Sequence, residues 1–448
     1  MTDLALDDSA ASTLWPRLAI WAGALALAIF FLSEGIGLTQ KTSDEIEYDY
    51  EYAEFPALPE SDFAMFYAGA ALVTSAERAN VYDKRTIVLN IYEERGWDRS
   101  LIPADFDPDG PDYVWQRYYN PPFFLLALSP LTSLDLHTAF LVSIGANVIL
   151  LILLAVLLGA VLRWRQPQTL LLAVAIFGFS PIYFALHHGQ PTILLACLMA
   201  GGYLALRNGR HLIAAGLLAT TGLKPHWLFP AAAVMVKDKR LLALFVAACF
   251  LLLALPFALV GPGAVFDYVA LVTSRGESDL TDSSYSGALL RWTGFFRALA
   301  GEPRPELWLI ASIGTVALFA LVWWRSGQGM TMAAGVVTTL LVVPHSHPQD
   351  WVLLLPAAAI LLSLDWGRIG LAGVSIGLLA IFVGANQWPE AQRAMDRDGS
   401  AVYWVTLAAA GLLVWLAGLE LAKGRLPQSV WWRWNGVQEP ATVNADAG

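Results

Sequence analysis

The chain has 448 residues, of which 57% are hydrophobic and only 14% are charged, and its formal net charge is −10. A soluble domain carries about 25% charged residues, so the composition excludes an ordinary soluble protein. Repeated apolar runs near the ~20 residues that cross a bilayer indicate a polytopic helical membrane protein. The acidic balance argues against nucleic acid as a partner. Both cysteines, Cys197 and Cys249, fall in apolar runs, which argues against a structural disulfide.

The apolar runs predict the membrane segments in chain order. Ten runs have the character of ordinary spans, and they cover residues 18–38, 134–162, 170–186, 192–206, 241–260, 307–324, 331–343, 351–364, 369–383 and 402–421. No small-residue cleavage site follows the first run, so we expect no cleavable signal peptide. The prediction is therefore an all-α helical bundle with about 10–12 membrane segments.

Residues 211–236 do not fit a simple span, because basic residues flank both ends and Lys224-Pro225-His226 lies near the middle. Proline breaks a helix, and a cation at membrane depth is tolerated where it lines a protein cavity or water. We therefore expect two half-spans or a re-entrant pair here.

Charge predicts the orientation of the chain. Residues 39–120 hold 17 acidic and 7 basic side chains, a net charge of −10. The short connectors are basic instead, through Arg163, Arg165, Arg207, Arg210, Lys237, Lys239, Arg240, Arg325, Arg368, Lys423 and Arg425. Basic connectors stay in the cytoplasm. We therefore expect a cytoplasmic N-terminus (1–17), a transmembrane domain (18–422) with a large outer loop (39–120), and a cytoplasmic tail (423–448).

The outer loop has predicted structure of its own. Ser61–Glu77 is apolar at helical spacing, with Ser61 as a candidate N-cap. We expect this stretch to lie along the membrane surface as an amphipathic helix, and residues 81–95 to form a second one. Residues 261–286 are expected to form a second outer loop.

Asp62 is the principal candidate for chemistry, since it places a carboxylate early in the first long outer segment. Two interpretations of Asp62 are about equally well supported by the sequence. As an acid in the first turn of a helix it would complement the helix dipole. As a positioned carboxylate at the membrane face it would serve as a general base.

Four further polar clusters need a reason, because ionisable groups at membrane depth cost several kcal/mol unless they face a cavity or a partner. Arg117, Tyr119 and Asn120 precede a span and form either an aromatic belt or a site for a phosphate or a sugar hydroxyl. His188 and Gln190 occupy an outer turn, where solvated histidines are the commoner outcome. Lys224 and His226 lie in the broken segment, with snorkelling of the lysine as the alternative. His345, His347 and Asp350 form the last cluster.

The spacing of His345 and His347 can suggest a metal site, but no other nearby acid or histidine completes a ligand shell. We favour hydrogen bonding and positive charge for an anionic phosphate. Phosphate-binding glycine loops, the G-x-S-x-G elbow and the H-E-x-x-H motif are all absent from the sequence.

Five motifs in order resemble glycosyltransferase family 87, a group of the C superfamily of polytopic glycosyltransferases. They cover roughly residues 15–425 and read SDFAMFYAGAAL followed by VYD, YYNPPFFLLALSPL, HHGQPTILLACL, GLKPHWLFP and VVPHSHPQDWVLLLP. The chain departs from the family pattern at Pro191 and Thr192, where the Gly-Gln turn usually carries Asn.

The resemblance implies an inverting glycosyltransferase that moves mannose, or another hexose or pentose, from a polyprenyl-phosphate donor to a lipid- or glycan-linked hydroxyl. Asp62 would be the catalytic base. The donor phosphate and sugar would be bound by Lys224, His226, His345, His347, Gln190, His188, Arg117, Asn120, Tyr119 and Asp350. The leaving group of such a donor is a lipid monophosphate, whose charge Lys, His or Arg side chains can stabilise alone. We therefore expect no cofactor and no metal.

The resemblance also implies a bacterial inner membrane protein of the cell envelope, whose site faces away from the cytoplasm and whose partners are membrane lipids, the donor and the acceptor. An alternative of another class is a transporter or flippase of lipid-linked saccharide, which would also have many spans, a broken helix and buried cations. A noncatalytic scaffold would explain the hydrophobicity but not the outward clustering of polar residues.

Overall fold

The computed structural model describes residues 21–40 (except 24, 27, 31 and 34), 62–94, 120–164, 168–281, 291–344, 346–386 and 403–423. Every regular element in these ranges is a helix, which confirms the all-α prediction. The residues with predicted roles that lie outside the described ranges are Ser61, Arg117, Tyr119, Arg165, His345 and Arg425.

Six helices in these ranges are long and apolar enough to cross a membrane. They are Trp21–Gln40, α5 (Leu136–Val161), α11 (Lys239–Val260), α14 (Pro305–Arg325), α17 (Arg368–Asn386), and Trp404–Ala422 of α19 (Tyr403–Ala422). A seventh candidate is a pair, α6 (Gln168–Phe177) and α7 (Ser180–His187), bent by 44° at its break. The chain is therefore a polytopic membrane protein.

Shorter apolar helices fill the space between the long ones. Among them are α8 (Thr192–Arg207), α9 (His211–Thr220), α10 (Leu228–Met235), α15 (Gln328–Val342) and α16 (Leu354–Ser363). The predicted total of about 10–12 membrane segments depends on how many of these cross the bilayer, and it stays a prediction.

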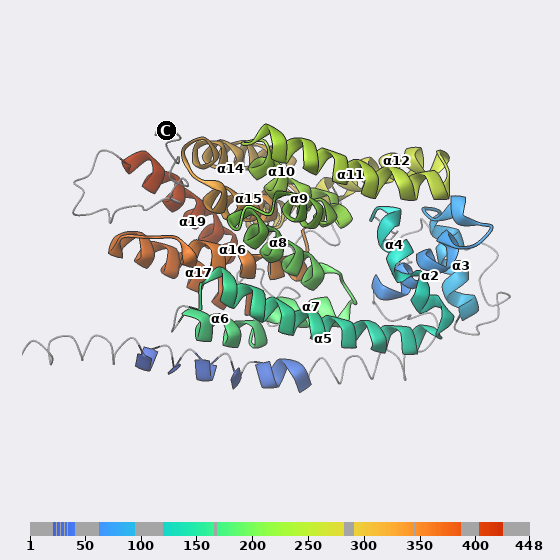
Figure 1. Ribbon diagram of the computed structural model, residues 1–448, viewed down its shortest axis with the longest axis horizontal. Helices are drawn as coiled ribbons and strands as arrows, with labels where there is room; N and C mark the ends of the chain where they lie inside the picture. Colours follow the sequence, from blue (N-terminus) through green and yellow to red (C-terminus); the bar gives the residue numbers. More distant parts are fainter. Residues whose placement is uncertain are drawn as a thin grey trace, which may run out of the picture.

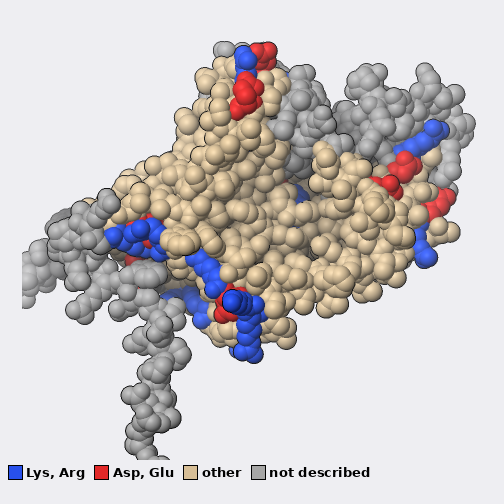
Figure 2. Space-filling view, turned by 90° about the horizontal axis from the view of Figure 1, so that it is seen from above, with Lys and Arg blue, Asp and Glu red and all other residues tan. Residues whose placement is uncertain are grey.

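Most of the visible surface carries no charged side chains. Figure 2 shows Lys, Arg, Asp and Glu gathered in a few separate clusters around a broad uncharged face. Such a surface is costly in water and favourable against lipid. The distribution of charge therefore agrees with the membrane class that the composition predicted.

The broken segment at Lys224 has the predicted form. Helix α9 ends at Thr220, two short 3₁₀ turns follow as η4 (Thr221–Leu223) and η5 (Pro225–Trp227), and α10 begins at Leu228. Lys224 joins the two turns in an extended conformation, as expected for a residue that precedes proline. Pro225 is the first residue of η5, which leads directly into α10.

Two helices occupy the region that was predicted as a second outer loop and its surroundings. α12 (Gly263–Thr281) follows α11 directly, and α13 (Trp292–Ala300) precedes α14. The description of 261–286 as a loop is therefore wrong for residues 263–281. The charged residues of this stretch led to the prediction of a loop. The helix is stabilised by tertiary contacts, because α12 packs along α11 (Figure 1).

α2 (Asp62–Val73) corrects the expectation of an amphipathic surface helix. Eleven of its twelve residues are buried, on all sides of the helix. The reason is in its sequence, because after Asp62 it carries no charged residue that could form a polar face. It ends at Val73, four residues before the predicted end at Glu77. The second predicted helix of this region is α3 (Lys84–Glu94).

α2, α3 and α4 (Pro122–Leu128) lie together at one end of the molecule (Figure 1). Aromatic contacts join α2 to its neighbours: the Phe66 ring meets that of Phe124 in α4 edge to face at 5.3 Å, and the Phe63 ring lies 5.4 Å from that of Phe140 in α5. The hydroxyl of Tyr67 donates to the carbonyl oxygen of Leu134 at 2.6 Å, just before α5. These contacts hold the first residue of α2 against the bundle.

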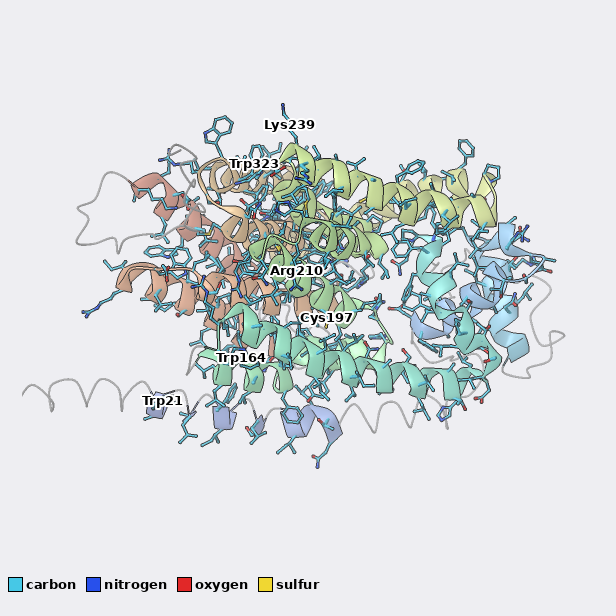
Figure 3. All side chains as sticks on the ribbon, in the orientation of Figure 1. Trp21, Trp164, Cys197, Arg210, Lys239 and Trp323 are labelled. Atoms are coloured by element: carbon cyan, nitrogen blue, oxygen red, sulfur yellow. The ribbon has the colours of Figure 1, made fainter. Side chains whose placement is uncertain are left out.

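Basic connector residues cap helix C-termini elsewhere in the bundle. The Arg207 guanidinium donates to the carbonyl oxygens of Ala160 and Val161 at 2.8 Å each, at the end of α5. The Lys237 ammonium donates to the carbonyl of Trp323 at 2.6 Å, at the end of α14. Trp323 and Lys239 are labelled in Figure 3, away from α2–α4. Cations are favourable there because a helix C-terminus is the negative end of its dipole.

Candidate functional site

Asp62 is the first residue of α2 and is only 9% exposed. Its carboxylate oxygen Oδ2 accepts a hydrogen bond from Nε2 of Gln190, which is 128 residues away in the sequence. A neutral amide donor stabilises a carboxylate without cancelling its charge. The structure thus brings two predicted site residues together and keeps the carboxylate out of bulk solvent.

The turn that carries Gln190 is built around Gly189. Its φ is +61°, a left-handed conformation that favours glycine. A Cβ at this position would meet Cβ of Phe63 at 2.6 Å. The amide of Phe63 donates to the carbonyl oxygen of His188 at 3.1 Å. The turn therefore abuts the first turn of α2, and only a residue without a side chain allows that approach.

A buried ion pair forms the second polar contact of the site. Nζ of Lys224 lies 2.7 Å from Oδ1 of Asp350, and their side chains are 9% and 1% exposed. The other oxygen of Asp350 accepts from the backbone amide of His347 at 3.0 Å. Asp350 is thus the partner that holds the lysine in place. A lysine ammonium has three donors, and this contact uses one of them.

His226 lies beside this pair, half-buried, with its ring centroid 5.4 Å from that of Trp227. It is close enough to both Lys224 and Asp350 to interact with their charges. His347 is also half-buried and begins the 3₁₀ turn η7 (Pro348–Leu353) that contains Asp350. Two of the predicted imidazoles therefore lie at the ion pair.

The Asp62–Gln190 contact and the Lys224–Asp350 pair are formed by elements that pack against one another. η7, which carries Asp350, packs against α7 and α8, the two helices on either side of the turn that carries Gln190. η7 and η5 also pack against α15. Segments from four distant parts of the sequence therefore meet around the α7–α8 turn.

Several buried polar atoms in these segments have no hydrogen-bond partner among the described residues. They are Oε1 of Gln190, Oγ1 of Thr192, Nε2 of His226, Oγ of Ser346 and Nε1 of Trp351. A buried polar atom without a partner costs about 1–3 kcal/mol, so such atoms are few in native structures and call for an explanation. Because these five belong to segments that also hold the Asp62–Gln190 contact and the ion pair, they favour a site for a polar molecule that supplies the missing partners.

Thr192 and Trp351 were not predicted as site residues. Each lies within two positions of a predicted one, Gln190 or Asp350, but hydroxyl and indole groups in apolar runs carry no spacing signal. Only the packing of η7 on α8 identifies them.

Two further predicted site residues, Asn120 and His188, contact aromatic side chains. The hydroxyl of Tyr82 donates to the carbonyl oxygen of Asn120 at 3.2 Å. Burial raises the pKa of the Tyr82 phenol, and the neighbouring Tyr268, whose ring lies 5.3 Å away, adds to the shift. Tyr82 therefore stays neutral as a donor. The His188 ring stacks on that of Phe184 at 6.4 Å.

The described residues contain no group of three His, Cys, Asp or Glu side chains that could hold a metal ion. His345, a member of the H-x-H pair, lies outside them. The expectation that no metal takes part therefore stays a prediction.

The chain is similar to a known membrane-lipid mannosyltransferase over part of its length. A polyprenol-phosphate-mannose-dependent alpha-(1-2)-phosphatidylinositol mannoside mannosyltransferase from Mycobacterium tuberculosis is 29% identical over 162 residues. This match covers 33% of the present chain and 36% of the relative, so the alignment spans about a third of that protein.

The sequence model of glycosyltransferase family 87 matches residues 118–344, just over half of the 448 residues. The matched region contains the α7–α8 turn with Gln190 and the broken segment with Lys224, while Asp62 and Asp350 lie outside it and reach the site through the fold. With a family match over half of its length and an all-helical membrane architecture, the chain belongs to glycosyltransferase family 87.

Proposed function

We propose that this protein is an inverting glycosyltransferase that moves a sugar from a polyprenyl-phosphate donor to a hydroxyl group of a lipid- or glycan-linked acceptor. The observation that carries the proposal is the buried contact between Asp62 and Gln190, on a turn whose flanking helices α7 and α8 pack against η7, the element that holds Asp350 of the Lys224–Asp350 pair. A base and a phosphate-binding cation are the two groups that such a transfer needs.

Asp62 acts as the base in this proposal. Its Oδ2 is held by Gln190, and Oδ1 makes no hydrogen bond with the described residues, so it can accept the proton of the acceptor hydroxyl. The hydroxyl oxygen then forms a bond to the anomeric carbon as the bond from that carbon to the phosphate oxygen breaks. The proton goes to Asp62 and the electron pair leaves with the phosphate. A single in-line displacement inverts the configuration.

Lys224 stabilises the departing phosphate. Its ammonium is fixed by Asp350 and keeps donors for a second anion, and His226 lies beside it. A fixed cation aimed at developing negative charge is worth more than one that must reorganise. The buried atoms of Thr192, Ser346 and Trp351 offer hydrogen bonds to sugar hydroxyls or phosphate oxygens.

Mannose is the donor sugar to test first, because the similar mannosyltransferase is named for a polyprenol-phosphate-mannose donor. That protein acts on a phosphatidylinositol mannoside, which makes a glycolipid the first acceptor class to test. We further propose that the site faces the extracytoplasmic side of a bacterial inner membrane. The basic short connectors, such as those with Arg207, Arg210 and Lys237, support that orientation, because such connectors stay in the cytoplasm and leave the segment with Asp62 on the other side.

The experiment is transfer of a radiolabelled sugar by the purified protein in proteoliposomes. Polyprenyl-phosphate mannose is the first donor and a glycolipid extract is the acceptor. We expect a labelled product in which the anomeric configuration is inverted. Movement of the intact donor across the bilayer without transfer would overturn the proposal in favour of a transporter of lipid-linked saccharide.

A further inference from the structure

The break between α6 and α7 exposes backbone groups that a continuous helix would satisfy. α6 ends at Phe177, α7 begins at Ser180, and the two helices are bent by 44°. In an apolar environment each backbone group left without a partner costs several kcal/mol. The bend can therefore persist only where other side chains supply the missing hydrogen bonds.

One side chain bridges the break from a distant helix. Oδ1 of Asn386 accepts from the amide of Ser180 at 3.0 Å, and its Nδ2 donates to the carbonyl oxygen of Gly178. The hydroxyl of Tyr183 donates to the carbonyl oxygen of Phe177 at 2.8 Å. Asn386 thus contacts both sides of the break, with the donor and the acceptor of one planar amide.

The helix that carries Asn386 holds the break at a second point. Asn386 is the last residue of α17, and Phe382 lies one turn before it. The Phe382 ring lies 4.6 Å from that of Phe179, a residue of the break itself. α17 therefore contacts the two-residue break through an aromatic pair as well as through the amide.

The direction of α7 decides where the candidate site lies. α7 is only eight residues long and leads directly into the turn. Its C-cap carbonyl at His188 accepts from Phe63, and Gln190 contacts Asp62. We propose that Asn386 is a positioning residue for the transfer reaction: by bridging Gly178 and Ser180 it sets the angle of α7, and so holds Gln190 against Asp62. This inference rests on the proposed role of Asp62.

The test compares Asn386→Leu with Asn147→Leu in the full-length protein. Asn147 is also a buried asparagine, but its Nδ2 donates at 3.1 Å to Ser143 within its own helix, α5. Hydrogen–deuterium exchange is measured over residues 178–190 and at the start of α2. We expect faster exchange in both places for Asn386→Leu and wild-type exchange there for Asn147→Leu.

The kinetic readout separates positioning from a general loss of structure. A displacement of about 1 Å at a catalytic group can cost about a hundredfold in rate. We therefore expect Asn386→Leu to lower kcat roughly tenfold to a hundredfold, with the KM for the lipid-linked donor near the wild-type value. Asn386→Asp keeps an acceptor for Ser180 but replaces the donor to Gly178 with a second oxygen, so its kcat should also lie below that of the wild type.

Wild-type exchange and wild-type kcat in Asn386→Leu would overturn the inference. If that variant does not fold, Asn386→Asp decides the question by the same two readouts. The exchange result does not depend on the role of Asp62. Full activity of an Asp62→Asn variant would therefore refute the base assignment. The exchange data would still test whether Asn386 holds the break between α6 and α7.

Discussion

The carboxylate of Asp62 and the amide of Gln190 are hydrogen-bonded to each other although 128 residues separate them in the chain. The bond joins the first residue of α2 to the turn between α7 and α8. It places the proposed base on a rigid support, because α2 is buried along its length and the turn is fixed by Gly189.

Asp62→Asn should abolish most of the sugar transfer. The asparagine keeps an acceptor for Gln190 but cannot take a proton, and positioned base catalysis contributes about 10²–10⁴-fold. We expect kcat to fall by that factor while thermal stability in detergent stays close to wild type. The matched control is Asp135→Asn, at the exposed N-cap of α5, where asparagine caps as well as aspartate. Wild-type turnover in Asp62→Asn would rule out the base role.

Gly189→Ala should be more damaging than the same change at Gly209. Both glycines have a positive φ, +61° and +68°, and so both changes carry the cost of a left-handed alanine, about 1–2 kcal/mol. A Cβ at Gly189 would also meet Phe63 at 2.6 Å, whereas nothing lies within 4 Å of a Cβ at Gly209. We expect a larger fall in melting temperature and a loss of transfer activity for Gly189→Ala only. Equal effects of the two changes would show that the turn does not need its close contact with α2.

Lys224 and Asp350 should be strongly coupled in stability. Asp350→Asn leaves a buried ammonium without its counter-ion, and breaking such a pair costs about 3–5 kcal/mol. In the double variant Lys224→Met with Asp350→Asn no buried charge is left unpaired, so most of the free energy of unfolding should return. Chemical denaturation in detergent micelles measures this cycle.

Transfer activity should not return in that double variant, because it lacks the cation proposed for the phosphate. This outcome separates a structural pair from a functional one. If the double variant transferred sugar at the wild-type rate, Lys224 would have only a structural role.

Arg207→Gln should weaken the fold without changing the chemistry. The guanidinium makes two charge-assisted bonds of 2.8 Å to the C-terminal carbonyls of α5. We expect a loss of about 1–3 kcal/mol in unfolding free energy, since bonds to charged groups contribute about that much, with kcat unchanged. Arg210→Gln, at an exposed neighbouring position, is the control and should leave the melting temperature unchanged.

Hydropathy and charge were sufficient for the class of the protein and for most of its helices. The apolar run over 241–260 became α11 (Lys239–Val260), and the Lys-Pro-His sequence became the predicted break. These features depend on local chemistry, because a span needs about 20 apolar residues and proline disrupts a helix wherever it occurs in the interior.

The burial of α2 could not be predicted from hydropathy and charge. A short apolar helix can lie on a lipid surface or inside a protein, and its own residues are alike in both cases. The aromatic contacts of Phe63 and Phe66 with Phe140 and Phe124, which come from later in the chain, decide for the interior.

The sequence by itself determined that this is a helical membrane protein, and which polar side chains are too costly at membrane depth to lack a purpose. Only the tertiary structure decided their partners: Gln190 for Asp62, Asp350 for Lys224, and Asn386 for the bent helix pair. The physical reason is that the energy of a buried charge or amide depends on the atoms around it in space. Those atoms come from segments more than a hundred residues away, where no local periodicity can indicate them.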